Sequence, residues 1–381
     1  MSSKVKNILF VALWITVLSF FVKSNWKPLF QWEGRTDLEI VTNAAKNLQE
    51  GKPVYVADDL WQHTKPPLAT MLFIPLSLID KEILWPLWDL MNMALLIFMA
   101  LALARMAQKT FPKAPALLVS AIGIFAVTNF YLYEFRYGQY NMLTLAMILG
   151  AGLIQNRWSS GFLLVAAGFI KPTNILFLPW VLKERKRPIS FMLSAGLCTG
   201  ALLLIYGMCF GFSAVVADHL TWLKFIGEST EKYLYREVNY GIPSAISHYT
   251  NSKALHKALL LVGLLAGFFF AKRKLPSLLQ LSYAAILSLA LSPMTWWANF
   301  CILLPVSIWI IASVIEQVRS DKRLNLNSVV DLLIVYSGTQ LIFPSYLPDF
   351  IMLNTPRVAN PIWVYLFYMA KELYRQRKTP H

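Results

Sequence analysis

The chain has 381 residues, a length that would allow two or three soluble domains. However, 57% of the residues are hydrophobic, the mean hydropathy is +0.51, and the apolar residues come in long runs, which argues against a soluble globular protein. A net charge of +15 would suggest nucleic acid as a partner of a soluble chain. Here the basic residues cluster in short connections between apolar runs, so we expect membrane topology and no nucleic-acid partner.

The first apolar run, 7–22, has a basic start and no small-residue cleavage site after it, so we interpret it as an uncleaved signal anchor. It is followed by a first outer loop, 25–83, which includes the polar stretch 34–67. The apolar piece 68–79 within this loop is too short for an ordinary span. We therefore predict a re-entrant or interfacial helix there.

Further apolar runs predict an all-α polytopic membrane protein in which residues 1–381 form one domain. A second large outer loop, 212–253, contains an amphipathic stretch. Including the first run, about 12 transmembrane helices are predicted, at 7–22, 84–104, 115–133, 140–155, 159–170, 173–182, 189–211, 254–271, 276–291, 299–315, 328–343 and 359–371.

This count puts both termini in the cytoplasm and leaves every basic cluster on the cytoplasmic side. We expect the membrane to be the cytoplasmic (inner) membrane of a bacterium. The two short spans that meet at Lys171 and Pro172 are expected to line a cavity. The basic clusters lie at 105–113, 183–187, 272–274, 319–323 and 371–378.

The unusual polar strings all fall on the outer side of this topology. Charges at membrane depth are costly and mark functional sites, so several loops of this kind predict one outer-face site assembled from many helix ends. The strings lie at 36–39, 63–67, 134–141, 170–174, 236–249 and 291–300.

Asp37 is the candidate catalytic residue in the first of these strings. A carboxylate just after a membrane helix can act as general base toward an attacking hydroxyl. The alternative is a solvated residue or the N-cap of a following helix, which Thr36 and Asp37 would suit. Glu39 could form a divalent-metal pair with Asp37, but there are few carboxylates and no histidine nearby, so we expect no metal and no cofactor.

Lys65, Arg136 and Lys171 form a second group, suited to a phosphate that gains negative charge as it leaves. Two alternatives stay open, because Lys171 could extend toward the outer interface and Arg136 could pair with Glu134. The third group offers amide, imidazole and aromatic side chains to a sugar or an acceptor, although the tryptophans would also suit an interfacial belt. Its members are Gln139, Asn141, Asn239, Tyr240, His248, Trp296 and Trp297.

Several residues are left without an assigned role. Asp89, His63 and His219 are polar residues of this kind. Three cysteines fall in apolar runs without metal spacing, and we interpret them as core residues. There is no glycine-rich phosphate loop, so a sugar donor should be lipid-linked rather than a nucleotide sugar.

The order of the motifs resembles glycosyltransferase family 87. After Asp37 come GKPVY, a proline pair, RYGQYN, KPT and SPMTW, at 51–55, 66–67, 136–141, 171–173 and 292–296. Characterised members resemble polyprenol-phosphate-mannose-dependent α-mannosyltransferases of GT-C fold. The chain departs from the family pattern at Lys65, where tyrosine is usual, and at 297–299, where histidines often follow the tryptophan.

The resemblance implies that Asp37 is the catalytic base of an inverting glycosyltransferase with an outer-face cavity. The donor would be a polyprenyl-phosphate sugar, with mannose the expected sugar, and the acceptor a lipid or glycan. Transfer of aminoarabinose or another sugar to lipid A is a second enzyme hypothesis. A transporter or flippase of a lipid-linked or anionic solute is the alternative from another class.

Overall fold

The computed structural model describes residues 36–55, 63–234, 239–247, 253–321, 323–336 and 361–378, and over these residues it contains helices and connections but no strand. The first predicted span, 7–22, lies outside this part. The first half holds α2 (Thr36–Gln49), α3 (Pro67–Leu72), α4 (Ile74–Ser77), α5 (Lys81–Gln108), α6 (Ala116–Arg136), α7 (Asn141–Leu153), α8 (Arg157–Ile170), η1 (Pro172–Phe177), α9 (Leu178–Lys183) and α10 (Pro188–Phe210). The second half holds α11 (Phe212–Leu234), α12 (Ile242–Ser247), α13 (Lys253–Lys272), α14 (Ser277–Leu291), η2 (Trp297–Leu303), α15 (Leu304–Asp321), α16 (Leu326–Tyr336) and α18 (Pro361–Lys378).

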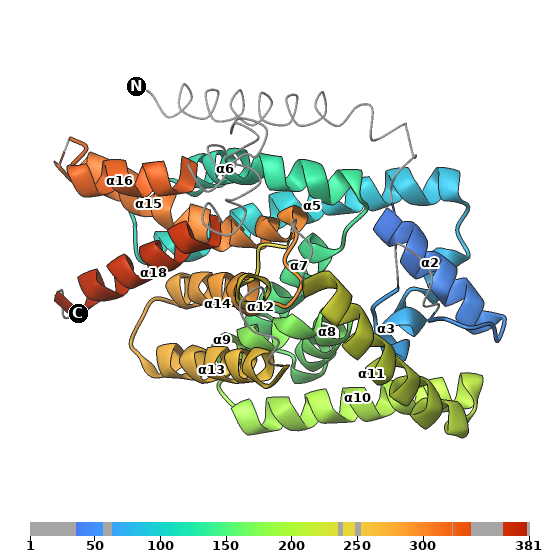
Figure 1. Ribbon diagram of the computed structural model, residues 1–381. Coiled ribbons are helices and arrows are strands. Elements are labelled where there is room, and N and C mark those ends of the chain that lie inside the picture. Colours follow the sequence, from blue (N-terminus) through green and yellow to red (C-terminus); the bar gives the residue numbers. More distant parts are fainter. Residues whose placement is uncertain are drawn as a thin grey trace.

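Local sequence explains where the long helices begin and end. Proline occupies the start of α10, where its missing N–H costs nothing, and Asn156 caps α8 by accepting from the backbone N–H groups of Trp158 and Ser159. Gly211 ends α10 at φ +97°, a conformation that glycine adopts most readily. The result is a bundle of long helices that lie roughly side by side (Figure 1).

Three described helical segments are long and apolar enough to cross a membrane: Lys81–Gln108, Pro188–Phe210 and Ala298–Asp321. The bent helix α6 would make a fourth if it is counted as one span. Four other apolar helical segments, in α7, α8, α13 and α14, are shorter than 18 residues. The fold is therefore that of an all-helical membrane protein, in which several predicted spans form short helices.

The segment 68–79 forms two short helices, α3 and α4, separated by Phe73. Six and four residues are too few for a span. The predicted break between the spans 159–170 and 173–182 also has a structural counterpart, because α8 ends at Ile170 and the chain continues as the 3₁₀ helix η1.

The basic connections lie together at one end of the bundle, opposite α2 (Figure 1). Arg319 donates to the carbonyl of Lys113 at 2.8 Å, and Lys113 donates its backbone N–H to Glu316 at 2.6 Å. Lys183 donates to the carbonyls of Arg273 and Leu275. Segments that topology predicted to share one side are therefore in contact with each other.

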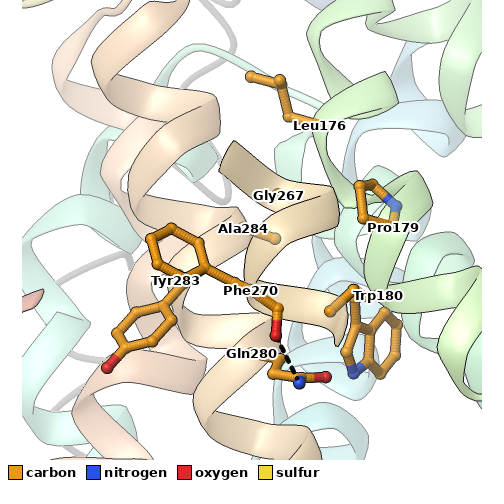
Figure 2. Close-up of a pocket in the computed structure, with 9 residues that line it drawn as sticks. Leu176, Pro179, Trp180, Gly267, Phe270, Gln280, Tyr283 and Ala284 are labelled. Carbon is orange, nitrogen blue, oxygen red and sulfur yellow. Dashed lines mark hydrogen bonds between the residues drawn. The ribbon is translucent and has the colours of Figure 1, made fainter. Parts of the chain in front are cut away.

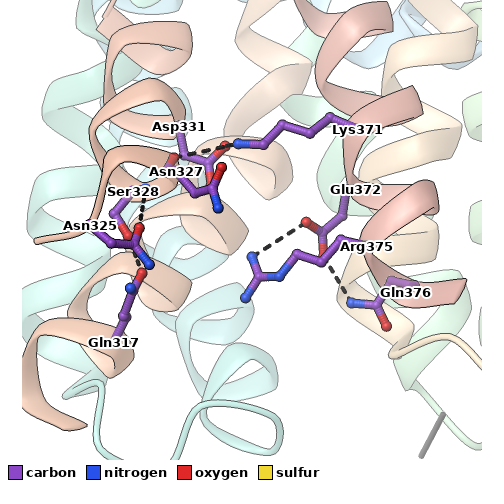
Figure 3. Close-up of polar contacts among 9 residues, drawn as sticks. All are labelled: Gln317, Asn325, Asn327, Ser328, Asp331, Lys371, Glu372, Arg375 and Gln376. Atoms are coloured by element: carbon purple, nitrogen blue, oxygen red, sulfur yellow. Dashed lines mark hydrogen bonds and ion pairs between the residues drawn. The ribbon is translucent and has the colours of Figure 1, made fainter. Parts of the chain in front are cut away.

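The C-terminal helix is held by charged and amide side chains at the same end (Figure 3). Lys371 on α18 pairs with the buried Asp331 on α16. Glu372 is 2% exposed, accepts from Gln376, and pairs with Arg375 at 3.6 Å. The Lys371–Asp331 pair attaches α18 to α16, and α18 also packs on α14, so we interpret this cluster as structural.

Candidate active site

The start of α2 is fastened to the turn between α6 and α7. The backbone N–H of Asp37 donates to the carbonyl of Tyr137 at 3.2 Å, and the Gln139 side-chain amide donates to the Asp37 carboxylate. Segments 100 residues apart in sequence therefore meet at Asp37. Asp37 itself is half-buried.

Gly138 permits this contact. Its φ is +58°, and a Cβ there would lie 2.9 Å from Cζ3 of Trp85 and 3.0 Å from Cβ of Leu38, the neighbour of Asp37. Leu38 and Trp85 are both buried in a cluster that α2, α3 and α5 share. Only glycine fits both the backbone conformation and the close approach of α2 to the turn.

A chain of hydrogen bonds runs from Asp37 to Lys171. Gln139 Oε1 accepts from Asn141 Nδ2 at 3.3 Å, and Asn141 Oδ1 accepts from Lys171 Nζ at 2.7 Å. Each amide donates toward the carboxylate and accepts from the side of the lysine. The two amides therefore fix the positions of one carboxylate and one ammonium group relative to each other.

Glu134 holds the Asn141 end of this series of hydrogen bonds in place. Its carboxylate accepts from Asn141 Nδ2 at 2.8 Å and from the backbone N–H of Met142 at 3.0 Å, and Cys301 Sγ lies 3.8 Å from Oε2. Glu134 is fully buried, and Asn141 is 1% exposed. A buried charge requires such partners, and here they make Asn141 the junction between two carboxylates and Lys171.

Lys65 reaches the same place from the segment that precedes α3. Its ammonium lies 4.6 Å from the centre of the Tyr140 ring, a cation–π contact. The backbone of its loop is held by Tyr55, whose hydroxyl donates to the carbonyl of Lys65 at 2.8 Å, and by Trp222, whose indole N–H donates to the carbonyl of Thr64 at 3.1 Å.

The pKa values of Asp37 and Lys65 are shifted by burial and by mutual charge. Burial raises the pKa of Asp37 to about 6, although the nearby Lys65 charge opposes the rise. Burial lowers the pKa of Lys65 to about 8, with Asp37 opposing the decrease and Lys171 adding to it. Asp37, Lys65 and Lys171 thus form one group of interacting charges in which the carboxylate is more basic than usual.

Arg136 and the aromatic residues lie outside the group formed by Asp37, Lys65 and Lys171. Arg136 is exposed and stacks over Tyr137, 5.7 Å from the ring centre, so among the described residues no ion pair joins it to Glu134. Trp296 is partly exposed. Tyr240 packs edge-on against Phe300, the sequence neighbour of Cys301, and this connects the segment before α12 to the Glu134 side of the site.

Asn239 holds the loop that carries the SPMTW motif. Its side chain accepts from the N–H groups of Gly241 and Thr295 and donates to the carbonyl of Pro293 at 2.7 Å. His248 and the Trp297 side chain lie outside the described part of the chain. Sugar contacts by this third group stay a prediction.

Glu39 and His63 have structural partners. The Glu39 carboxylate forms an ion pair with Lys81. Over the described residues, no three His, Cys, Asp or Glu side chains gather in a way that would hold a metal ion. His63 is buried and bonded to Thr70 Oγ1 at 2.7 Å, and burial, together with Lys65, lowers its pKa to about 3. It is therefore neutral.

Sequence reasoning gave no role in the site to Glu134, Tyr140 or Cys301. A carboxylate flanked by apolar residues near a helix end was the available signal for Glu134, since such charges need partners. Nothing in the sequence marks Tyr140 or Cys301 as a site residue. Tyr140 belongs to the site because it contacts Lys65, and Cys301 because it contacts Glu134, and both contacts depend on the tertiary fold.

A small pocket lies elsewhere, among η1, α9, α13 and α14 (Figure 2). Gln280 donates to the carbonyls of Phe270 and Arg273, while its Oε1 and the hydroxyl of Tyr283 have no hydrogen-bond partner among the residues that the structure describes. The space amounts to about 10 Å³, enough for one water. This pocket is not the substrate site.

Gly138→Ala is expected to lower both thermal stability and activity. Gly51 provides a matched control, because its φ is +65° but a Cβ there would meet nothing within 4 Å. Gly51→Ala should therefore show only the backbone cost of about 1 kcal/mol, whereas Gly138→Ala should add the displacement of Trp85 and Leu38. Thermal unfolding in detergent measures the difference, and equal effects of the two substitutions would contradict it.

Comparison with known proteins matches the sequence model of glycosyltransferase family 87 to residues 63–293. No curated protein and no solved structure matches the chain. The matched range includes Lys65, the 134–141 turn and Lys171, while Asp37 precedes it.

Proposed function

The chain belongs to glycosyltransferase family 87, and from this we propose that it is an inverting, GT-C-type enzyme with about 12 transmembrane helices. It moves mannose from a polyprenyl-phosphate donor to a hydroxyl of a lipid or glycan acceptor at the outer face of the cytoplasmic membrane. The observation that supports this most is the hydrogen-bond chain from Asp37 through Gln139 and Asn141 to Lys171. This chain of hydrogen bonds fixes Asp37, the proposed base, relative to Lys171, the proposed phosphate-binding cation.

In the proposed reaction, the Asp37 carboxylate accepts the proton of the acceptor hydroxyl. The acceptor oxygen forms a bond to the anomeric carbon as the bond from that carbon to the phosphate oxygen breaks. The electron pair leaves on polyprenyl phosphate, whose charge Lys65 and Lys171 stabilise, with Arg136 at the exposed rim. No general acid is needed, because phosphate is already a good leaving group.

Gln139 is suited to orient the base. Its amide donates to Asp37 and its carbonyl oxygen is held by Asn141, so the amide cannot turn without losing one of these bonds. Asn239, Tyr240, His248, Trp296 and Trp297 remain the proposed sugar or acceptor contacts. A transporter without glycosyl transfer is not favoured, since the family is one of transferases.

The pH profile of kcat/KM is expected to be bell-shaped. Asp37 must be deprotonated to accept a proton, so the rate should rise with pH through about 6. Lys65 must be protonated to stabilise phosphate, so the rate should fall through about 8. Initial rates from pH 4.5 to 9.5 measure this profile. A rate that is flat across this range would contradict both assignments.

The identity of the sugar is tested with a panel of donors. The purified protein in liposomes is incubated with polyprenyl phosphate carrying mannose, glucose or aminoarabinose, together with a membrane lipid extract. We expect a labelled acceptor product from the mannose donor. A product only from another donor would keep the transfer but correct the sugar, and Lys65, where the chain departs from the family, is the first residue to examine.

A further inference from the structure

Helix α11 presents two distinct edges outside the protein core. Four large apolar residues on it are more than half exposed: Phe212 (63%), Val216 (62%), Leu220 (60%) and Leu223 (55%). At 3.6 residues per turn they fall within an arc of roughly 80°. The neighbouring exposed arc, of about the same width, carries polar side chains and one alanine. Its polar members are Ser213, Thr221, Lys224 and Glu228.

The remaining face of α11 packs on the protein. Phe225 is buried against Tyr55, with ring centres 5.4 Å apart, and Trp222 donates to the carbonyl of Thr64. Tyr206 on α10 donates to Asp218 at 2.6 Å. The helix is therefore fixed in rotation, and its two exposed edges point in set directions.

The apolar edge continues the surface of a membrane span. α11 follows α10 directly at Gly211 and runs obliquely from that end of α10 toward α12 (Figure 1). α10 meets the criteria of a span and exposes Leu197, Leu204 and Met208. Exposed apolar side chains on α10 are thus followed, one residue past the bend, by the exposed Phe212.

We propose that α11 is a boundary helix whose apolar edge is seated in the lipid of the outer leaflet, with its polar edge in the headgroup and water layer. A sharp division between an apolar and a polar edge is typical of helices at a membrane interface. The lipid would then also support the loop of Lys65, because Trp222 and Tyr55 connect that loop to α11. This inference concerns the bilayer as partner and does not depend on glycosyl transfer.

Site-directed spin labelling of the full chain in lipid nanodiscs tests it. Cys198 and Cys209 are first replaced by alanine, while the buried Cys301 is left in place. Single cysteines are then introduced as Val216→Cys, Leu220→Cys and Leu223→Cys on one edge, and Thr221→Cys, Lys224→Cys and Glu228→Cys on the other. Each label is measured for collision with oxygen, which concentrates in lipid, and with a water-soluble nickel complex.

We expect the first three labels to favour oxygen and the second three to favour nickel, with a severalfold difference in the ratio. Six labels that all favour nickel would show a helix held in water, and six that all favour oxygen would show a fully embedded helix. First-edge labels that reach neither reagent would show that protein covers this edge, as a second copy or another segment of the chain would. Each of these three results would overturn the proposal.

Discussion

Asp37→Asn is expected to lower kcat/KM for sugar transfer by about 10²–10⁴-fold, the usual contribution of a general base. The substitution preserves the size of the side chain and leaves an oxygen that can accept from Gln139. The start of α2 should also stay in place, because the backbone N–H of residue 37 still donates to Tyr137. The loss would therefore be chemical. Initial rates with labelled donor in proteoliposomes measure it.

Stability measurements distinguish the loss of a catalytic base in Asp37→Asn from misfolding of the variant. The folded state raises the pKa of Asp37 from 3.8 to about 6, so the fold binds that proton more tightly than the unfolded chain. The stability gained in this way is present below pH 3.8 and is lost as pH rises through 6. At pH 7.5 Asp37→Asn should then unfold at the same or a higher temperature than the original protein. A large fall in unfolding temperature would contradict this account.

Two neighbouring carboxylates serve as comparisons for Asp37. Glu50 follows the end of the same helix, is exposed, and pairs with Lys52. Glu50→Gln should therefore leave the transfer rate within about twofold of that of the original protein. Glu39→Gln tests the metal alternative. If Glu39→Gln removed activity as fully as Asp37→Asn, a metal held by the pair would replace the general base.

Lys171→Met is expected to lower kcat by about 10²–10³-fold, because it removes a positive charge where the leaving phosphate gains negative charge. Lys171→Gln is the informative companion. Glutamine can still donate to Asn141 Oδ1, as Lys171 does at 2.7 Å, but it carries no charge. The electrostatic account predicts similar losses for both variants. Recovery of activity in Lys171→Gln alone would show that the lysine only positions Asn141.

The control for Lys171 is Lys52→Met, which removes an exposed lysine just after α2 and should leave the rate unchanged. Measuring kcat and KM separately matters here. A charge that acts mainly in the transition state lowers kcat, whereas one that only attracts the donor raises KM. We expect Lys171 to affect mainly kcat.

The sequence was sufficient to bring the charged members of the site together. Basic clusters assigned one side to the short connections, so the opposite helix ends, with Asp37, Lys65 and Lys171, had to share the other side. The structure brings these three into one interacting group. Counting spans is enough to assign each loop to one side of the membrane. Ionisable residues near a span are rare, so those on the same side are readily identified as site candidates.

The arrangement within the site could not be predicted in the same way. Gln139 and Asn141 were expected to contact sugar hydroxyls, which stays a prediction, but their hydrogen bonds to Asp37, Glu134 and Lys171 were not predicted. A polar side chain two residues from a helix start can face either direction, and the choice follows from tertiary packing around Gly138. Hydropathy likewise located the break at Lys171, but it does not distinguish a span from the short helices found on both sides.

The most direct test of the central claim uses a donor that carries two labels, ³²P in the phosphate and ¹⁴C in the mannose. After incubation with protein and acceptor, transfer predicts that ¹⁴C moves to the acceptor while ³²P stays on the polyprenyl lipid. Asp37→Asn should abolish this separation. If the two labels remained together on the lipid, or moved together to the acceptor, the protein would not be the transferase proposed here.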